Sequence, residues 1–169
     1  MTISKTIRVY DYVNHPYAEV REKLISGSPG IFRDATKSAA GRAKSVASEL
    51  RVNFAGIEVG ADISISVTKI QEQSESPLTG QVTQINLEWE ASRMPRLFPF
   101  MKANLSLYAL TATETQLDLL GNYEPPFGLF GSAMDAVIGH RIAEASVHQF
   151  IADVAEYLRS TLPQFTAKG

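Results

Sequence analysis

The sequence predicts an α+β fold in which an antiparallel β-sheet is covered on one face by a long C-terminal helix. Several stretches between residues 60 and 124 alternate apolar and polar side chains, as strands with one buried and one solvated face do. From Ser132 to Leu162 the chain contains no proline and repeats apolar residues at helical spacing. A sheet with one apolar face has to be covered, and this last segment is the only one expected to be long enough.

The composition is that of an ordinary globular domain. The chain has 169 residues, of which 44% are hydrophobic and 20% charged, and its formal net charge is −2. This length favours a single domain over residues 1–169. The charge balance gives no indication of a nucleic-acid partner. The absence of cysteine excludes disulfides, thiolate metal sites and a cysteine nucleophile.

The N-terminal part predicts one strand and two helices. Residues 4–13 alternate around Ile7 and Val9, which indicates a strand. The sequence NHP ends it at the surface, with His15 expected to be solvated, and a helix over 16–26 follows. GSPG at 27–30 is interpreted as a break. A second, modestly basic helix is predicted over 31–50, where a helical stripe is formed by Phe32, Ala35, Ala39, Arg42, Val46 and Leu50.

Strands dominate the middle of the chain. Period-2 alternation predicts them over 60–70, 81–92, 101–111 and 115–124, and a further short strand is expected over 50–59. Polar links such as ATET at 112–115 suit hairpins. The alternation places the following residues on the inner face of the sheet: Ile63, Ile65, Val67, Ile85, Leu87, Trp89, Met101, Ala103, Leu105, Leu107, Ala109, Leu117, Leu119 and Tyr123.

The C-terminal helix is predicted to be about 30 residues, or about 45 Å, long. Its main apolar stripe is formed by Ala136, His140, Ala143, Val147, Ile151, Val154 and Leu158. Met134, Ile138, Ile142 and Ala145 are expected on the opposite side, so its N-terminal half is apolar on two faces. Such a helix end is either buried or in contact with a second partner.

The segment GNYEPPFGLFG at 121–131 connects the last strand to this helix. Its glycines permit tight turns and its prolines stiffen the chain, so it is interpreted as the hinge that sets where the helix lies. Three aromatic residues, Tyr123, Phe127 and Phe130, are expected to close one end of the space between the sheet and the helix.

Taken in order, these elements resemble the START-like, Bet v 1-like superfamily, also called the polyketide cyclase/SRPBCC group. The resemblance covers about residues 4–162 and is carried by the opening strand, NHPYAEVREKL, the antiparallel strands, and GNYEPPFGLFGSAMDAVIGH leading into the long helix. It implies a helix-grip fold, in which a curved antiparallel sheet wraps around the C-terminal helix, with two shorter helices after the first strand. It also implies an apolar cavity for lipids, sterols or polyketides, and some members catalyse cyclisation or dehydration. The long, basic segment 31–50 departs from the family pattern.

The leading hypothesis is therefore a protein that binds a small hydrophobic or lipid-like molecule between the sheet and the C-terminal helix, for transport or sequestration. Trp89 is either core or cavity wall, and His140 is a candidate polar group of an apolar cavity. The loop 92–102 mixes cations with large apolar residues, which suits the mouth of a pocket. The candidate ligand-binding residues are Trp89, Arg93, Phe98, Met101, Leu105, Tyr123, Phe127, Phe130, Met134, His140 and Val147.

Two alternatives remain open. The first is a polyketide cyclase/dehydratase-like enzyme that uses polar groups of the same cavity, although no acid–base constellation is visible and no catalytic residue is assigned. The second is a protein-interaction module that uses residues 31–50 and the 92–102 loop. The spacing His140, Glu144, His148 is compatible with metal ligands, but His148 lies well off the stripe, so no metal is assigned.

No cofactor, no nucleic-acid partner and no stable membrane insertion are expected, and a homodimer is left open. The N-terminus has no apolar segment typical of a signal peptide, and no apolar run is long enough to span a bilayer. The default expectation for location is therefore cytoplasmic.

Overall fold

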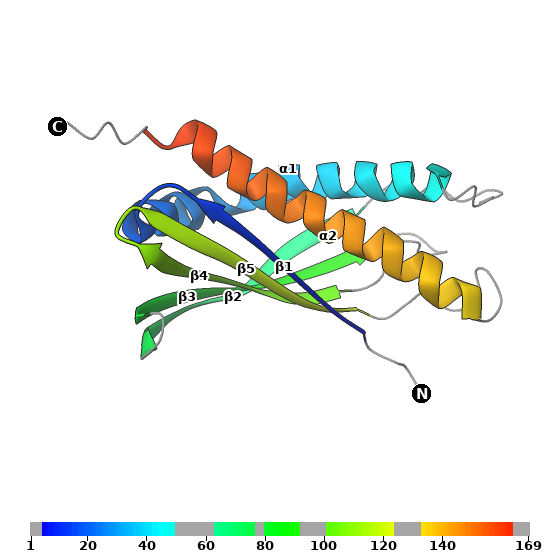
Figure 1. Cartoon of the computed structure of the whole chain (residues 1–169), viewed down its shortest axis with the longest axis horizontal. Helices are drawn as coiled ribbons and strands as arrows, with labels where there is room; N and C mark the ends of the chain where they lie inside the picture. Colours follow the sequence, from blue (N-terminus) through cyan, green and yellow to red (C-terminus); the bar gives the residue numbers. More distant parts are fainter. Residues whose placement is uncertain (1–4, 50–62, 77–79, 92–100, 124–132, 164–169) are drawn as a thin grey trace.

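The computed structural model describes residues 5–49, 63–76, 80–91, 101–123 and 133–163. The chain forms β1 (Lys5–Val13), α1 (Tyr17–Glu49), β2 (Ile63–Ser76), β3 (Gly80–Ala91), β4 (Met101–Thr111), β5 (Glu114–Tyr123) and α2 (Ala133–Thr161). The described strands form one antiparallel sheet in the order β1-β5-β4-β3-β2, and both helices lie on the same face of it (Figure 1). The α+β class, the curved sheet and the covering C-terminal helix are confirmed. The short strand expected over 50–59 lies outside the described residues.

The alternation predicted the inner face of the sheet well. Two rows of paired residues cross β3, β4 and β5, and a third crosses β4 and β5. Their side chains are at most 2% exposed: Trp89, Met101 and Tyr123; Ile85, Leu105 and Leu119; and Leu107 with Leu117. Ala109, expected to face inward, is exposed. It lies next to the β4–β5 hairpin, where the register of β4 shifts between Ala109 and Thr111. Alternation therefore predicts the sheet's middle better than its turns.

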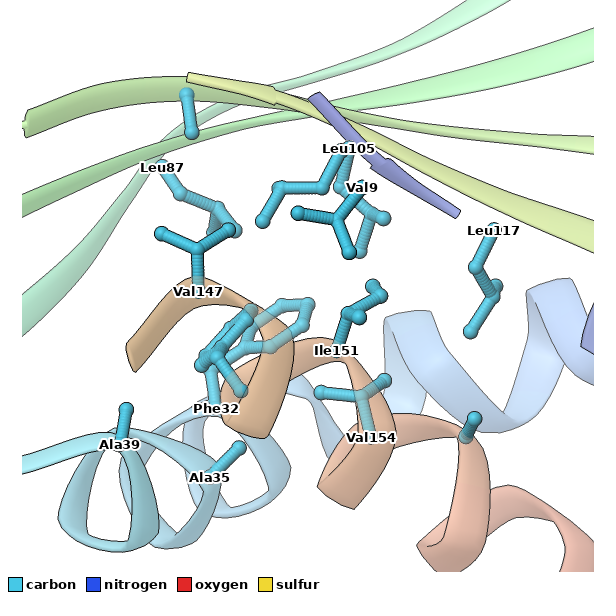
Figure 2. Packing of buried hydrophobic residues seen from close by; sticks show 14 of the residues in the cluster. Val9, Phe32, Ala35, Ala39, Leu87, Leu105, Leu117, Val147, Ile151 and Val154 are labelled. Carbon is cyan, nitrogen blue, oxygen red and sulfur yellow. The ribbon is translucent and has the colours of Figure 1, made fainter. Parts of the chain in front are cut away.

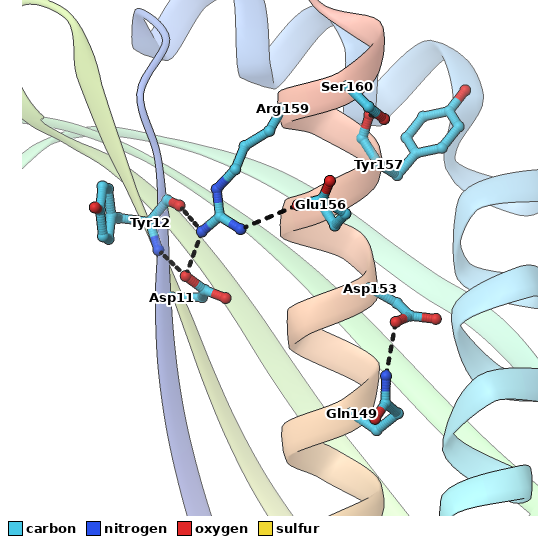
Figure 3. A network of polar contacts seen from close by, with 8 residues as sticks. All are labelled: Asp11, Tyr12, Gln149, Asp153, Glu156, Tyr157, Arg159 and Ser160. Carbon is cyan, nitrogen blue, oxygen red and sulfur yellow. Dashed lines mark hydrogen bonds and ion pairs between the residues drawn. The ribbon is translucent and has the colours of Figure 1, made fainter.

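The break predicted at residues 27–30 is wrong, because α1 is a single helix from Tyr17 to Glu49. A proline within a helix removes one hydrogen bond and favours a bend. The ribbon of α1 does change direction along its length (Figure 3). The helix continues because the buried residues before and after 27–30 lie on the same face of it. Leu24 and Ile31 are seven residues apart, which is close to two full turns.

α1 is also a second cover for the sheet, which corrects the expectation that only the C-terminal helix is long enough. Its residues Phe32, Ala35 and Ala39 are buried, and they face the sheet together with α2 (Figure 2). The stripe expected over 31–50 is thus an inner surface in its described part. Arg42, placed on that stripe, is exposed, and Ala43 takes the inner position.

Trp89 joins the sheet to both helices. Its indole N–H donates to Thr36 Oγ1 of α1 at 3.0 Å, and its ring meets Phe150 of α2 edge-on, with centroids 4.8 Å apart. Phe150 in turn stacks on Phe32 of α1 at 5.9 Å. The described contacts of Trp89 are therefore those of a core residue whose polar atom is already satisfied.

The connection between β1 and α1 gives a further correction. His15 was expected at the surface, but it is only 2% exposed. Its carbonyl oxygen accepts a hydrogen bond from Thr115 Oγ1 at 2.8 Å, which ties this connection to the start of β5. α1 begins directly after Pro16, whose carbonyl accepts from the N–H groups of Glu19 and Val20. The NHP turn is thus packed against the β4–β5 hairpin instead of being solvated.

Candidate ligand site at the open end of the sheet

One end of the sheet collects the residues that bear on ligand binding. At this end β3 and β5 finish and β4 and α2 begin, whereas the β4–β5 hairpin lies at the opposite end (Figure 1). Strand pairing aligns Trp89 with Met101 and Met101 with Tyr123. Three candidate residues from separate strands therefore form one continuous row on the inner face.

A polar chain leads from this row toward solvent. The Tyr123 hydroxyl lies 2.7 Å from His140 Nδ1, and the two rings stack with centroids 6.1 Å apart. On the other side of the imidazole, Nε2 lies 3.7 Å from the carboxylate of Glu144, one turn further along α2. Tyr123 is 1% exposed, while the side chains of His140 and Glu144 are 41% and 52% exposed. Tyr123, His140 and Glu144 are called the polar chain below.

The electrostatics of the polar chain favour a neutral phenol. Burial raises the pKa of Tyr123 above its usual value, and the nearby carboxylate of Glu144 raises that pKa further. A protonated hydroxyl is able to donate to His140 Nδ1, and the proton of the neutral imidazole then sits on Nε2, toward Glu144. The tautomer that suits Tyr123 thus also suits Glu144.

The middle of the sheet–helix interface is filled by side chains. Leu105 and Val147, two of the candidate residues, are 0% and 3% exposed. Figure 2 shows them among Val9, Ile151 and Phe32, with side chains from the sheet and both helices pointing toward one another. A side chain that borders a water-sized space keeps some accessible surface, so the described part of this region is solid. The open side of the site is therefore the end where His140 is half-exposed.

Several candidates cannot be placed in this geometry. Arg93, Phe98, Phe127 and Phe130 lie outside the described residues, and Met134 lies in the first turn of α2, where side chains are not described. The homodimer expectation depended on Met134 and Ile138, and no contact within the described ranges supports it. The structure thus brings together Trp89, Met101, Tyr123 and His140, with Leu105 and Val147 deeper in the core.

Sequence reasoning missed two features of the site. Thr36 accepts the indole N–H of Trp89, and nothing in its spacing marks it as a partner of the sheet. Gly121 makes room for Met101: a Cβ added to Gly121 would lie 2.9 Å from Met101 Sδ. Gly121 sits directly between Ile7 and Ala103 in the sheet, so it lets a large side chain lie flat on the inner face.

Within the described ranges, no group of three or more His, Asp or Glu side chains is placed to hold a metal ion. His148, the third residue of the spacing noted in the sequence, is exposed. Neither α1 nor α2, in the part of the chain that is described, is long and apolar enough to cross a membrane.

No family model and no curated protein matches the chain. Among solved structures, it is similar to an aromatase/cyclase from a Streptomyces species, with 13% identity, a TM-score of 0.46, and 94% of this chain and 93% of that chain covered. It is also similar to norcoclaurine synthase from Thalictrum flavum in complex with dopamine and hydroxybenzaldehyde, with 9% identity, a TM-score of 0.45, and 96% and 91% covered. A Thermus thermophilus protein gives 12% identity, a TM-score of 0.47, and 92% and 98% covered. Likeness at this level says nothing about ligand or reaction, so the function has to be argued from this chain's own residues.

Proposed function

We propose that this protein binds a small, largely apolar molecule carrying one hydrogen-bonding group, at the end of the sheet where Tyr123 and His140 meet. The observation that carries the proposal is the hydrogen bond of 2.7 Å between the Tyr123 hydroxyl and His140 Nδ1, set at the end of an apolar row. A few polar groups beside apolar surface are the usual way in which a pocket orients a hydrophobic ligand.

The position of the pair defines the chemistry of the ligand. Its apolar body would enter beside the row formed by Met101 and Tyr123, which Leu105 closes toward the interior. Because both side chains are at most 1% exposed, they would have to move apart to admit it. Its polar group would meet His140, the half-exposed member of the polar chain. Because Glu144 places a carboxylate next to this imidazole, an uncharged donor or acceptor group suits the site better than an anion.

A second candidate function is acid–base catalysis on the same ligand, as in a cyclase or dehydratase. Two polar groups, the Tyr123 hydroxyl and His140 Nδ1, lie within hydrogen-bond distance of each other. The phenol hydroxyl and the imidazole form a hydrogen-bonded pair between which a proton can be transferred. The polar chain therefore favours this candidate over a purely apolar binding site.

The described structure does not favour the third hypothesis, a protein-interaction module. The apolar side of the 31–46 stretch is used to cover the sheet, with Phe32, Ala35 and Ala39 all at most 3% exposed. What remains outward on this helix is polar, as at Arg33 and Asp34, which pair with each other at 3.8 Å. Exposed pairs of this kind contribute little to stability or recognition.

The test uses N-phenyl-1-naphthylamine, an uncharged fluorescent probe with one N–H donor. We expect the wild-type protein to enhance its fluorescence saturably, and His140→Ala to weaken its affinity roughly three- to tenfold, as the loss of one hydrogen bond does. His148→Ala is the matched control, since His148 is exposed on the same helix two turns away. Equal affinities for the wild type and His140→Ala, or no saturable binding, would contradict the proposal.

The catalytic candidate has a separate readout. Native mass spectrometry of gently purified protein is expected to show a retained molecule. If the protein is an enzyme, Tyr123→Phe should retain the unreacted substrate. Catalysis would be favoured if the wild type retains a product whose mass differs from that of the molecule retained by Tyr123→Phe. Retention of one unaltered mass by both proteins would favour binding alone.

A further inference from the structure

A concave region lies at the opposite end of the molecule from Tyr123 and His140. It is a cleft of about 790 Å³, formed by the end of β1 and the turn after it, the β4–β5 hairpin, and the last turns of α2. Along α2, its residue Arg159 is 19 positions from His140, which corresponds to roughly 28 Å of helix. This cleft is therefore separate from the proposed hydrophobic site and is called the hairpin cleft below.

The hairpin cleft carries more negative than positive charge. Glu114 of the hairpin and Glu156 of α2 both line it, and Arg159 is the single cation among its lining residues in the described ranges. Glu114 makes no ion pair with any described residue, and its nearest printed contact is Thr111 Oγ1 at 3.5 Å. Glu114 therefore offers a ligand a carboxylate that pairs with no described cation, whereas Glu156 shares the guanidinium of Arg159 at 3.7 Å.

The guanidinium of Arg159 offsets this excess only in part, because its charge is already shared with Asp11. Nη2 donates to Asp11 Oδ1 and to the carbonyl oxygen of Tyr12, both at 2.6 Å, and Nη1 lies 3.7 Å from Glu156 (Figure 3). The guanidinium carbon also lies 5.6 Å from the centre of the Tyr12 ring. Arg159 therefore holds α2 to β1, and an anionic ligand would find its charge neutralised by Asp11.

An unused polar atom lies in the same wall. His15 lines the hairpin cleft and is 2% exposed, and its Nδ1 has no hydrogen-bond partner. The nearest acid, Glu19, is 3.7 Å from Nδ1, which is too far for a hydrogen bond. A buried polar atom without a partner is costly, and it marks a place where a partner is missing. When it carries no proton, this nitrogen is an acceptor that lacks a donor.

We propose that the hairpin cleft binds a small aliphatic amine in its ammonium form. Such a ligand brings a positive charge to Glu114 and Glu156, and three N–H donors to a wall whose acceptors outnumber its free donors. A neutral polyol would satisfy hydrogen bonds but not the charge, and a carboxylic acid would be repelled. The charge excess and the unused imidazole nitrogen thus point to the same class of ligand.

The test is a titration of the full-length, ¹⁵N-labelled protein with putrescine, followed by NMR at neutral pH. We expect saturable shifts confined to the amides of residues 12–15, 113–114 and 156–160, and a shift of the His15 imidazole nitrogen. Glu114→Gln and Glu156→Gln are each expected to weaken binding roughly two- to fivefold, as the loss of one exposed ion pair does. The neutral isostere 1,4-butanediol and the dianion succinate should not produce these shifts.

Glu22→Gln is the matched control, because Glu22 is an exposed carboxylate on α1 that does not line the cleft. It should bind putrescine as the wild type does, and the amide spectrum of each variant reports directly that it is folded. Equal shifts with butanediol, shifts spread over all surface carboxylates, or unchanged affinity in both cleft variants would overturn the proposal.

Discussion

Tyr123 combines a buried phenol ring with a hydroxyl that reaches a half-exposed imidazole. Burial, and then the charge of Glu144, raises the pKa of this phenol in the folded protein. In the unfolded chain a tyrosine ionises near pH 10, so with rising pH the unfolded state loses this proton first. The contribution of Tyr123 to the free energy of unfolding is therefore complete below about pH 10 and is lost as the pH rises through the raised pKa.

Replacing Tyr123 with Phe is expected to remove this pH dependence. At pH 8 the wild type should be more stable by about 0.5–1.5 kcal/mol, because the hydrogen bond to His140 is present. Between pH 8 and pH 11 the wild type should lose more stability than Tyr123→Phe. Urea unfolding across this range measures both effects. Burial also raises the pKa of Tyr108, but that residue is common to both proteins. Curves that fall in parallel would contradict this assignment.

At the scale of elements, α1 shows that helical phase can outweigh a local breaking signal. A proline and two glycines between Gly27 and Gly30 suggest a break, but the buried residues Leu24 and Ile31 lie on one face of a continuous helix. A break would place one of the two away from the core. The free energy gained by burying the apolar residues before and after 27–30 therefore exceeds the cost of the proline, which is about 3 kcal/mol in a helix interior.

Gly30 and Gly41 test this continuity directly. In the structure, a Cβ added at either glycine would have no neighbour within 4 Å. We expect Gly30→Ala to raise the free energy of unfolding by about 0.5–1 kcal/mol, because alanine is the better helix former. Gly41→Ala is the control, since residue 41 is helical whether or not the helix is broken earlier. A gain at Gly41 with none at Gly30 would show that 27–30 is not helical in solution.

The same comparison explains which parts of the structure were predictable. Alternation identified the inner face because a strand such as β4 needs only one local rule, and Met101 and Leu105 obey it. The pairing of Tyr123 with His140 was not predictable, since the length of 124–132 does not fix where α2 crosses β5. The burial of His15 depends on Thr115, 100 residues away, and no local pattern encodes such a contact.

For the whole molecule, Trp89 is the point where the sheet and both helices meet. We expect Trp89→Phe to lower the free energy of unfolding by about 1–3 kcal/mol, through a smaller ring and the lost hydrogen bond to Thr36. Thr36→Val should cost about 1–3 kcal/mol, because it leaves a buried indole N–H without an acceptor. Urea unfolding of both single variants and the double variant measures their coupling, and strictly additive losses would show that the bond contributes nothing.

The order of the strands has a consequence for how this chain acquires its structure during synthesis. β1 pairs with β5, and Arg8 reaches Asp118 across 110 residues of sequence. β1 and α1 are therefore synthesised long before β5, the strand with which β1 pairs. Arg159, which binds Asp11 of β1 from α2, is synthesised only near the end of the described chain. Contacts this distant in sequence form slowly. A nascent chain therefore exposes the apolar sides of α1 and β1 until β5 and α2 have been synthesised, and exposed apolar surface of this kind favours aggregation.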